Sequence, residues 1–127
     1  MAQNGCVLFA KNIDSMTAFY QSVLKMDVTE TGESHTVLSN GSIELVIHGI
    51  PAKVAQSIVI SEPPEKRNNA VFKPAFVVTS LDDVQRAAKA AGGGLKPKSA
   101  AWEIRGALVL DGWDPEGNII QFKQFGA

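Results

Sequence analysis

The stretch Phe9-Ala10-Lys11-Asn12-Ile13-Asp14 decides the fold, because a matching stretch, Val77-Val78-Thr79-Ser80-Leu81-Asp82, returns in the second half of the chain. Each stretch closes an apolar segment typical of a strand and leads into an amphipathic segment typical of a helix. A strand, an amphipathic helix and a run of strands are predicted in Val7–His48, and the same order returns in Ala75–Phe125. The sequence therefore predicts an α+β fold of two βαβββ modules, about residues 5–60 and 73–125.

In the first module we expect a helix to begin near Ser15, after the capping residues Asn12 and Asp14. One face of this helix is apolar at helical spacing and is formed by Met16, Phe19, Tyr20, Val23 and Leu24. Asn40-Gly41 tolerates positive φ and predicts a hairpin turn. Strands are predicted at Val28–Glu30, Thr36–Ser39 and Ile43–His48.

In the second module Ser80 or Asp82 caps a helix that ends at Gly92-Gly93-Gly94, since each glycine disfavours helix by about 1 kcal/mol relative to alanine. A tight turn is predicted at Asp114-Pro115-Glu116-Gly117. Strands are predicted at Leu95–Lys98, Glu103–Asp111 and Asn118–Phe125.

The segment between the modules is expected to hold a short helix in Pro51–Ser57 and a polar linker at Ser61–Asn69. Neither module has enough elements to bury a sheet face alone. We therefore expect residues 1–127 to form a single domain.

Composition narrows the class of partner. The 127 residues carry 12 Lys and Arg against 13 Asp and Glu, a formal net charge of −1. This balance provides no long-range field for nucleic acid or an anionic membrane. The single cysteine, Cys6, and the lack of an apolar run of about 20 residues favour a cytoplasmic location.

Two motifs carry a resemblance to a known family. Lys11-Asn12-Ile13 precedes a helix containing Phe19-Tyr20, and Asp114-Pro115-Glu116-Gly117-Asn118 precedes Ile119-Ile120-Gln121-Phe122. With the duplicated βαβββ order, the chain resembles the vicinal oxygen chelate superfamily, the glyoxalase, bleomycin-resistance and extradiol-dioxygenase group. The resemblance implies a curved mixed sheet around a cavity, often completed by a second subunit, and hence a homodimer.

Metal-binding members of this superfamily place His, Glu or Gln at one inward position on the first and last strands of each module. Carried over, these positions fall on Gly5, Glu44, Lys73 and Gln121. Glycine has no donor, and an ammonium group has no lone pair and repels a cation. We therefore expect neither a metal nor another cofactor, unless His35 or His48 supplies an imidazole from elsewhere.

Strand alternation predicts which side chains face the cavity. The inward set is largely apolar and consists of Val7, Phe9, Glu44, Val46, His48, Lys73, Ala75, Arg105, Ala107, Val109, Ile119 and Gln121. Trp102 and Trp113 either wall the cavity mouth or pack in the core or a dimer interface. Arg67 contacts a ligand only if the linker folds over the mouth. Such a cavity suits a small planar or anionic molecule.

Three functions remain open. The first is a metal-independent small-molecule-binding protein of the bleomycin-resistance type, with Phe9, Arg67, Lys73, Trp102, Arg105, Trp113 and Gln121 as ligand contacts. The second is a metal-dependent enzyme of the glyoxalase or dioxygenase kind, to which Glu44 contributes a ligand. The third is a metal-free isomerase or lyase with Glu44 or His48 as its catalytic base. Glu44 and Lys73 are equally expected to form only an ion pair.

Overall fold

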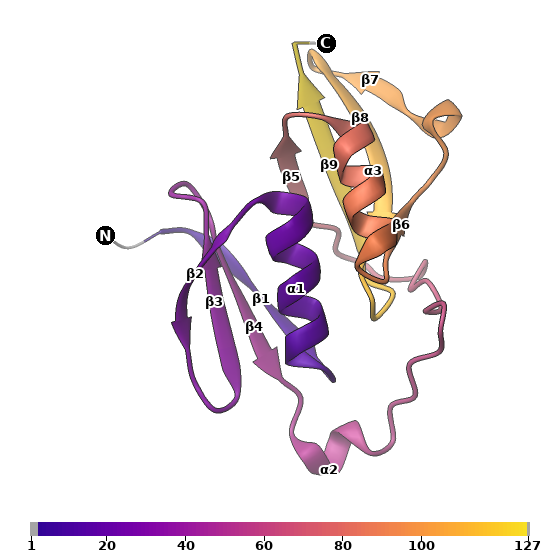
Figure 1. Ribbon diagram of the computed structural model, residues 1–127. Coiled ribbons are helices and arrows are strands. Elements are labelled where there is room, and N and C mark those ends of the chain that lie inside the picture. Colours follow the sequence, from indigo (N-terminus) through magenta and orange to yellow (C-terminus); the bar gives the residue numbers. More distant parts are fainter. Residues whose placement is uncertain (1–2, 127) are drawn as a thin grey trace.

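The computed structural model describes residues 3–126, and its two modules lie side by side (Figure 1). The first module consists of β1 (Gly5–Ala10), α1 (Ile13–Leu24), β2 (Asp27–Thr31), β3 (His35–Ser39) and β4 (Glu44–Gly49). The second consists of β5 (Ala75–Val78), α3 (Leu81–Ala90), β6 (Gly94–Leu95), β7 (Trp102–Ile104), β8 (Ala107–Trp113) and β9 (Ile119–Phe125). A one-turn helix, α2 (Ala52–Ala55), lies in the long connection between them. The predicted α+β class is confirmed.

Each module forms an open mixed sheet in which the first strand runs parallel to the last. The order is β1-β4-β3-β2 in the first sheet and β5-β9-β8-β6 in the second, where β7 also pairs with β8. The parallel pairs are β1 with β4 and β5 with β9, and the other pairs are antiparallel. Consequently β1 and β5 are edge strands of their sheets.

Helix α1 forms as the sequence predicts, but it begins two residues early. The N-cap is Asn12, whose side-chain oxygen accepts a hydrogen bond from the Ser15 amide at 3.0 Å. The helix ends where Lys25 adopts a left-handed conformation. All five residues of the predicted apolar face are buried, so the periodicity identified the packing face correctly.

The second module departs from prediction between residues 103 and 111. The single strand expected at Glu103–Asp111 is wrong, because Arg105 and Gly106 both have positive φ, 47° and 81°, and turn the chain back on itself. Strand β7 therefore folds against β8, with Trp102 opposite Val109. Arg105 lies exposed in this turn, and the expectation that it points inward from a strand is corrected.

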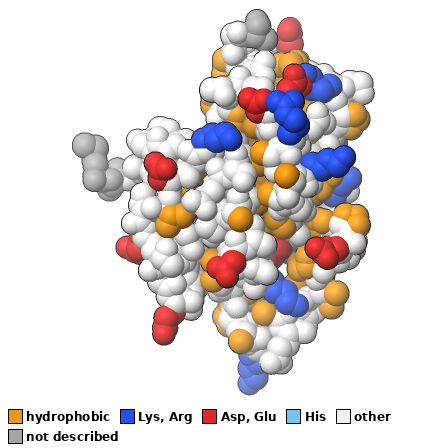
Figure 2. Space-filling model, viewed as in Figure 1, with side chains coloured by type: hydrophobic (Ala, Val, Ile, Leu, Met, Phe, Trp, Pro, Cys, Tyr) orange, Lys and Arg blue, Asp and Glu red, His pale blue; other side chains and the backbone are white. Residues whose placement is uncertain are grey.

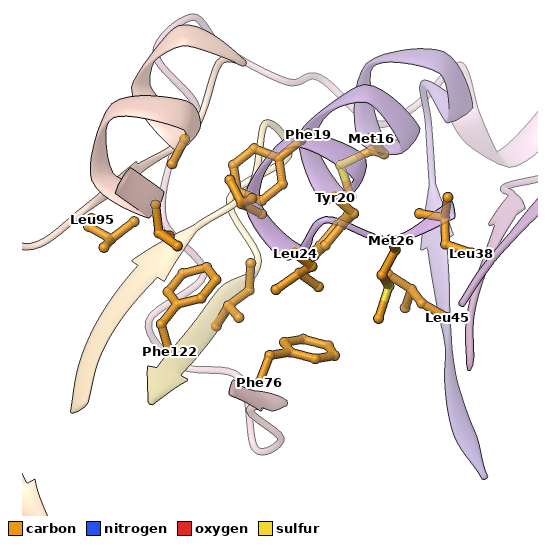
Figure 3. Close-up of a cluster of buried hydrophobic side chains, with 14 of the residues drawn as sticks. Met16, Phe19, Tyr20, Leu24, Met26, Leu38, Leu45, Phe76, Leu95 and Phe122 are labelled. Carbon is orange, nitrogen blue, oxygen red and sulfur yellow. The ribbon is translucent and has the colours of Figure 1, made fainter. Parts of the chain in front are cut away.

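One hydrophobic core joins the two modules (Figure 3). Phe19 and Tyr20 of α1 lie between Leu45 of the first sheet and Phe122 of the second. Phe19, Leu45 and Phe122 are at most 2% exposed. The core is therefore continuous across the two modules.

The turn at residues 114–118 fastens the second module to the start of α1. The Tyr20 hydroxyl donates a hydrogen bond to Asp114 at 2.7 Å, and both groups are buried. The carboxylate of Glu116 accepts hydrogen bonds from the backbone amides of Lys11 at 2.8 Å and Asn12 at 2.7 Å. The motif that carried the family resemblance is thus an intermodule clamp.

Burial changes the acidity of both groups in this clamp. Burial, followed by the neighbouring Asp114 carboxylate, raises the pKa of Tyr20 well above its ordinary value of 10.0. Burial also raises the pKa of Asp114, and it outweighs the hydrogen bonds donated by Tyr20 and Asn118. The hydrogen-bonded pair is therefore held with its phenol proton in place at neutral pH.

Charges of both signs are mixed on the surface seen in Figure 2, in keeping with the small net charge. Among residues 3–126, no helix combines the length and apolar character needed to cross a membrane.

Candidate functional site

A cavity of about 290 Å³, which we call the basic cavity, lies where the linker meets the second sheet. Its basic side chains are Lys66, Arg67, Lys73 and Lys96, and its other wall includes Asp111, Trp113 and Ile119. Residues 66–73 come from the connection between the modules, residues 50–74, which we call the linker from here on. The other wall residues come from β8 and β9, and Lys96 directly follows β6. The cavity therefore exists only because the linker folds over the sheet.

Strand register places the sheet residues of the cavity on one face. Asp111 of β8 lies opposite Gln121 of β9, and Gln121 lies opposite Ala75 of β5. Trp113, two residues beyond Asp111, therefore shares the face of Asp111. The backbone amide of Lys96 donates a hydrogen bond to the Asp111 carbonyl at 3.0 Å and extends this row.

The linker is held in place by the 114–118 turn. The Arg67 amide donates to the Gly117 carbonyl at 2.9 Å, and its Nε donates to the Glu116 carbonyl at 3.2 Å. Gly117 has a φ of +86°, and a Cβ on it would lie 2.0 Å from the Glu65 carbonyl oxygen. Glycine is therefore required where the linker approaches the turn. The linker therefore brings Arg67 to the wall of the basic cavity, and a ligand contact by Arg67 stays a prediction.

The charges of the basic cavity are only partly balanced. The Lys73 ammonium contacts the Asp111 carboxylate at 2.9 Å, and the Lys66 ammonium lies 3.9 Å from the centre of the Trp113 ring. Within residues 3–126, no acidic partner pairs with Lys66, Arg67 or Lys96. The cavity thus combines an aromatic face with an excess of positive charge, and it is suited to an anion.

The residues predicted for the first module gather elsewhere. Glu44 begins β4 and His48 lies four residues along the same strand, a separation of about 13 Å. The His48 ring packs near Phe9, with ring centroids 5.8 Å apart, and its Nδ1 lies 2.9 Å from the Gly49 carbonyl. His35 contacts Glu30 at 2.6 Å. Neither Glu44 nor His48 lines the basic cavity, and a catalytic role for them stays a prediction.

The ion pair considered between Glu44 and Lys73 does not form, since Lys73 pairs with Asp111. The register also separates the positions carried over from the family. Gly5 lies opposite Glu44, whereas Gln121 lies opposite Ala75, and Lys73 precedes β5. Lys73 reaches the same face only through its long side chain.

The residues present do not fit a divalent metal. A Cβ on Gly5 would lie 1.9 Å from the Glu44 carbonyl oxygen, so the backbone leaves no room for a ligand side chain there. Over residues 3–126, no three His, Cys, Asp or Glu side chains gather in a way that could hold a metal ion. His35 and His48 do not complete the set, because they lie opposite each other at the far end of the sheet from Glu44.

Of the predicted contacts, Arg67, Lys73 and Trp113 line the basic cavity. Gln121 lies opposite Asp111, on the sheet face that forms the cavity wall. The centre of the Trp102 ring lies 5.9 Å from the Lys73 ammonium. Phe9 and Arg105 lie away from the cavity. Sequence reasoning missed Lys66, Lys96 and Asp111. Strand alternation places Asp111 on the same face of β8 as Trp113, and this pattern could have identified Asp111 from the sequence. No local pattern identifies the two lysines.

The two modules each form an open mixed sheet, and a shared core and the turn at residues 114–118 join them. This arrangement defines the class of this protein. A model of the Glyoxalase/Bleomycin resistance protein/Dioxygenase superfamily matches residues 2–122. The chain belongs to this superfamily, and the predicted resemblance is confirmed. No curated protein matches it in sequence.

Solved structures of the same superfamily share the fold at low identity. A glyoxalase/bleomycin resistance protein/dioxygenase family enzyme from Burkholderia phytofirmans is 23% identical, with a TM-score of 0.70 over 97% of this chain and 98% of that one. The fosfomycin resistance protein FosX from Mesorhizobium loti is 11% identical, with a TM-score of 0.65 over 97% and 90%. A bleomycin resistance determinant encoded on transposon Tn5 is 18% identical, with a TM-score of 0.59 over the whole of both chains.

Proposed function

We propose that this protein binds and sequesters a small planar molecule that carries an anionic group, without the help of a metal. The observation that carries the proposal is the basic cavity, in which Lys66 and Lys96 lie beside the flat face of Trp113 and have no acidic partner within residues 3–126. An anion entering between these lysines forms charge-assisted hydrogen bonds. Its ring replaces the Lys66 ammonium on the Trp113 face.

Binding, rather than a metal-dependent reaction, is favoured by the donor set. The backbone excludes a side chain at Gly5, and the equivalent position opposite Gln121 is Ala75, which has no donor group. Two of the structural neighbours are named for resistance to fosfomycin or bleomycin, which is in keeping with a small-molecule ligand.

The test uses benzoate as a planar anion and benzyl alcohol as its uncharged counterpart, with binding to the full-length chain measured by calorimetry. We expect benzoate to bind at least about tenfold more tightly, the effect of one charge-assisted hydrogen bond. Lys96→Met should remove this preference. Lys89→Met, on the exposed face of α3, is the matched control. Equal binding of the two compounds, or tight retention of a divalent ion by the native protein, would contradict the proposal.

A further inference from the structure

A second cavity, of about 130 Å³, lies at the seam between the modules, and we call it the seam cavity. Its walls come from the edge strands β1 and β5 and from the linker, through Val7, Leu8, Phe72 and Phe76. Leu45 and Ile119 extend this apolar surface. The cavity therefore lies where the two sheets fail to pair with each other.

Two strong donors in the wall of the seam cavity are already engaged. The Tyr20 hydroxyl donates to Asp114 at 2.7 Å, and the Asn118 side-chain nitrogen donates to the same carboxylate at 2.9 Å. These two donors are directed at Asp114 and are not available to a guest. An apolar group is therefore the guest that this wall accommodates without loss of hydrogen bonds. The seam cavity, at about 130 Å³, is comparable in volume to apolar cavities of about 150 Å³ that hold benzene.

The two cavities adjoin each other. Ala70, Phe72 and Ile119 line both of them, so the same stretch of linker separates the lysines on one side from the apolar wall on the other. Phe72 is 74% exposed and Val7 is 59% exposed. A molecule that reached from one cavity into the other would cover both of these apolar side chains, which is favourable in proportion to the area removed from water.

We propose that the ligand is an amphipathic acid, whose carboxylate or similar anionic group lies in the basic cavity and whose aryl or short alkyl group fills the seam cavity. This inference rests on the proposed function, because the anionic group occupies the site described above. It adds the second half of the ligand and a second subsite. Phe72 lies over the junction and contacts the chain that connects the two ends.

The test compares phenylbutyrate with benzoate and with the uncharged phenylbutanol, using calorimetry on the full-length chain. The ring of benzoate lies on Trp113, whereas the longer chain of phenylbutyrate carries its ring into the seam cavity. Phenylbutyrate should bind at least about tenfold more tightly than benzoate, since three further methylenes are buried. Phenylbutyrate should also bind more tightly than phenylbutanol by a similar factor, because only phenylbutyrate carries a charge.

Two variants test whether the extra affinity of phenylbutyrate over benzoate comes from the seam cavity. Val7→Phe fills this cavity from an exposed position on β1 and should reduce phenylbutyrate binding to the level of benzoate, while benzoate binding is unchanged. Val28→Phe, at an exposed position on β2, is the matched control. Phe72→Ala leaves the core intact and should also reduce the gain, so the result does not depend on one substitution. Thermal unfolding confirms that each variant is folded.

The outcomes separate this inference from the proposed function. Equal affinity for benzoate and phenylbutyrate would overturn the amphipathic ligand and leave the anion site standing. A gain that survives both Val7→Phe and Phe72→Ala would overturn the seam cavity as the apolar subsite. No binding of either anion would overturn both proposals.

Discussion

At the scale of single residues, the buried pair of Tyr20 and Asp114 shows how a motif acquires its role. Tyr20 belongs to the apolar face of α1, yet its hydroxyl reaches a carboxylate in the other module at 2.7 Å. A buried carboxylate is tolerated because it accepts hydrogen bonds from Tyr20, Asn118 and the Glu116 amide. A phenol at this position therefore completes a polar network that a phenylalanine would leave short of one donor.

We predict that Tyr20→Phe lowers the free energy of unfolding by about 1–3 kcal/mol at neutral pH, because it removes one of the donors to the buried Asp114 carboxylate. The difference should narrow above about pH 10, where the unfolded chain loses the phenol proton and the folded protein keeps it. In that range the folded state binds more protons than the unfolded state, so the stability of the wild type falls as the pH rises. Tyr20→Phe has no phenol at this position and does not lose stability in this way. Urea unfolding of both proteins at neutral and alkaline pH measures the difference.

The same prediction has an optical control, since Tyr20 is the only tyrosine in the chain. Phenolate absorbance should appear well above pH 10.0 in the folded protein and near the ordinary value in urea. Ionisation of the folded protein near the ordinary value would contradict the assigned environment.

At the scale of elements, the start of α1 depends on a residue more than 100 positions away in sequence. Glu116 is 4% exposed and accepts hydrogen bonds from the amides of Lys11 and Asn12, with sequence separations of 105 and 104. Both amides precede the first turn of α1. The Asn12 side chain accepts a hydrogen bond from the Ser15 amide in the first turn. The start of α1 is therefore held both by its own N-cap and by Glu116 of the opposite module.

We predict that Glu116→Gln destabilises the protein by about 1–3 kcal/mol, because an amide nitrogen then faces one of the two backbone donors. Glu65→Gln, at an exposed position in the neighbouring linker, should change stability by less than about 0.5 kcal/mol. Urea unfolding measures both variants. Faster hydrogen exchange at the Lys11 and Asn12 amides in Glu116→Gln alone would locate the effect, and unchanged exchange there would argue against this clamp.

At the scale of the whole molecule, the sheet faces turned away from the helices expose large apolar side chains. Phe9 is 60% exposed on β1, Val77 is 63% exposed on β5 and Phe125 is 50% exposed on β9. We predict that these side chains contact a partner, as exposed apolar patches commonly do. A second copy of the chain, as the family resemblance implies, would cover them.

We predict that the protein is a homodimer and that Phe9→Ser shifts it toward the monomer by removing apolar area from the interface. Val59→Ser, which changes an 88% exposed side chain in the linker, is the control. Sedimentation equilibrium measures the mass against that of the 13.6 kDa chain. A monomer at every concentration tested would refute the dimer.

The sequence by itself determined the two modules, the apolar face of α1, the Asn40-Gly41 hairpin and the alternation along β4, because these depend on residues within a few positions of one another. It did not reveal the break at Arg105-Gly106, where a non-glycine residue adopts positive φ. Only the tertiary structure decided that Lys73 pairs with Asp111, 38 residues away, and that Lys66 lies over Trp113. The binding site is assembled by the fold of the linker over the second sheet, and no local periodicity encodes a contact between a loop and a distant strand.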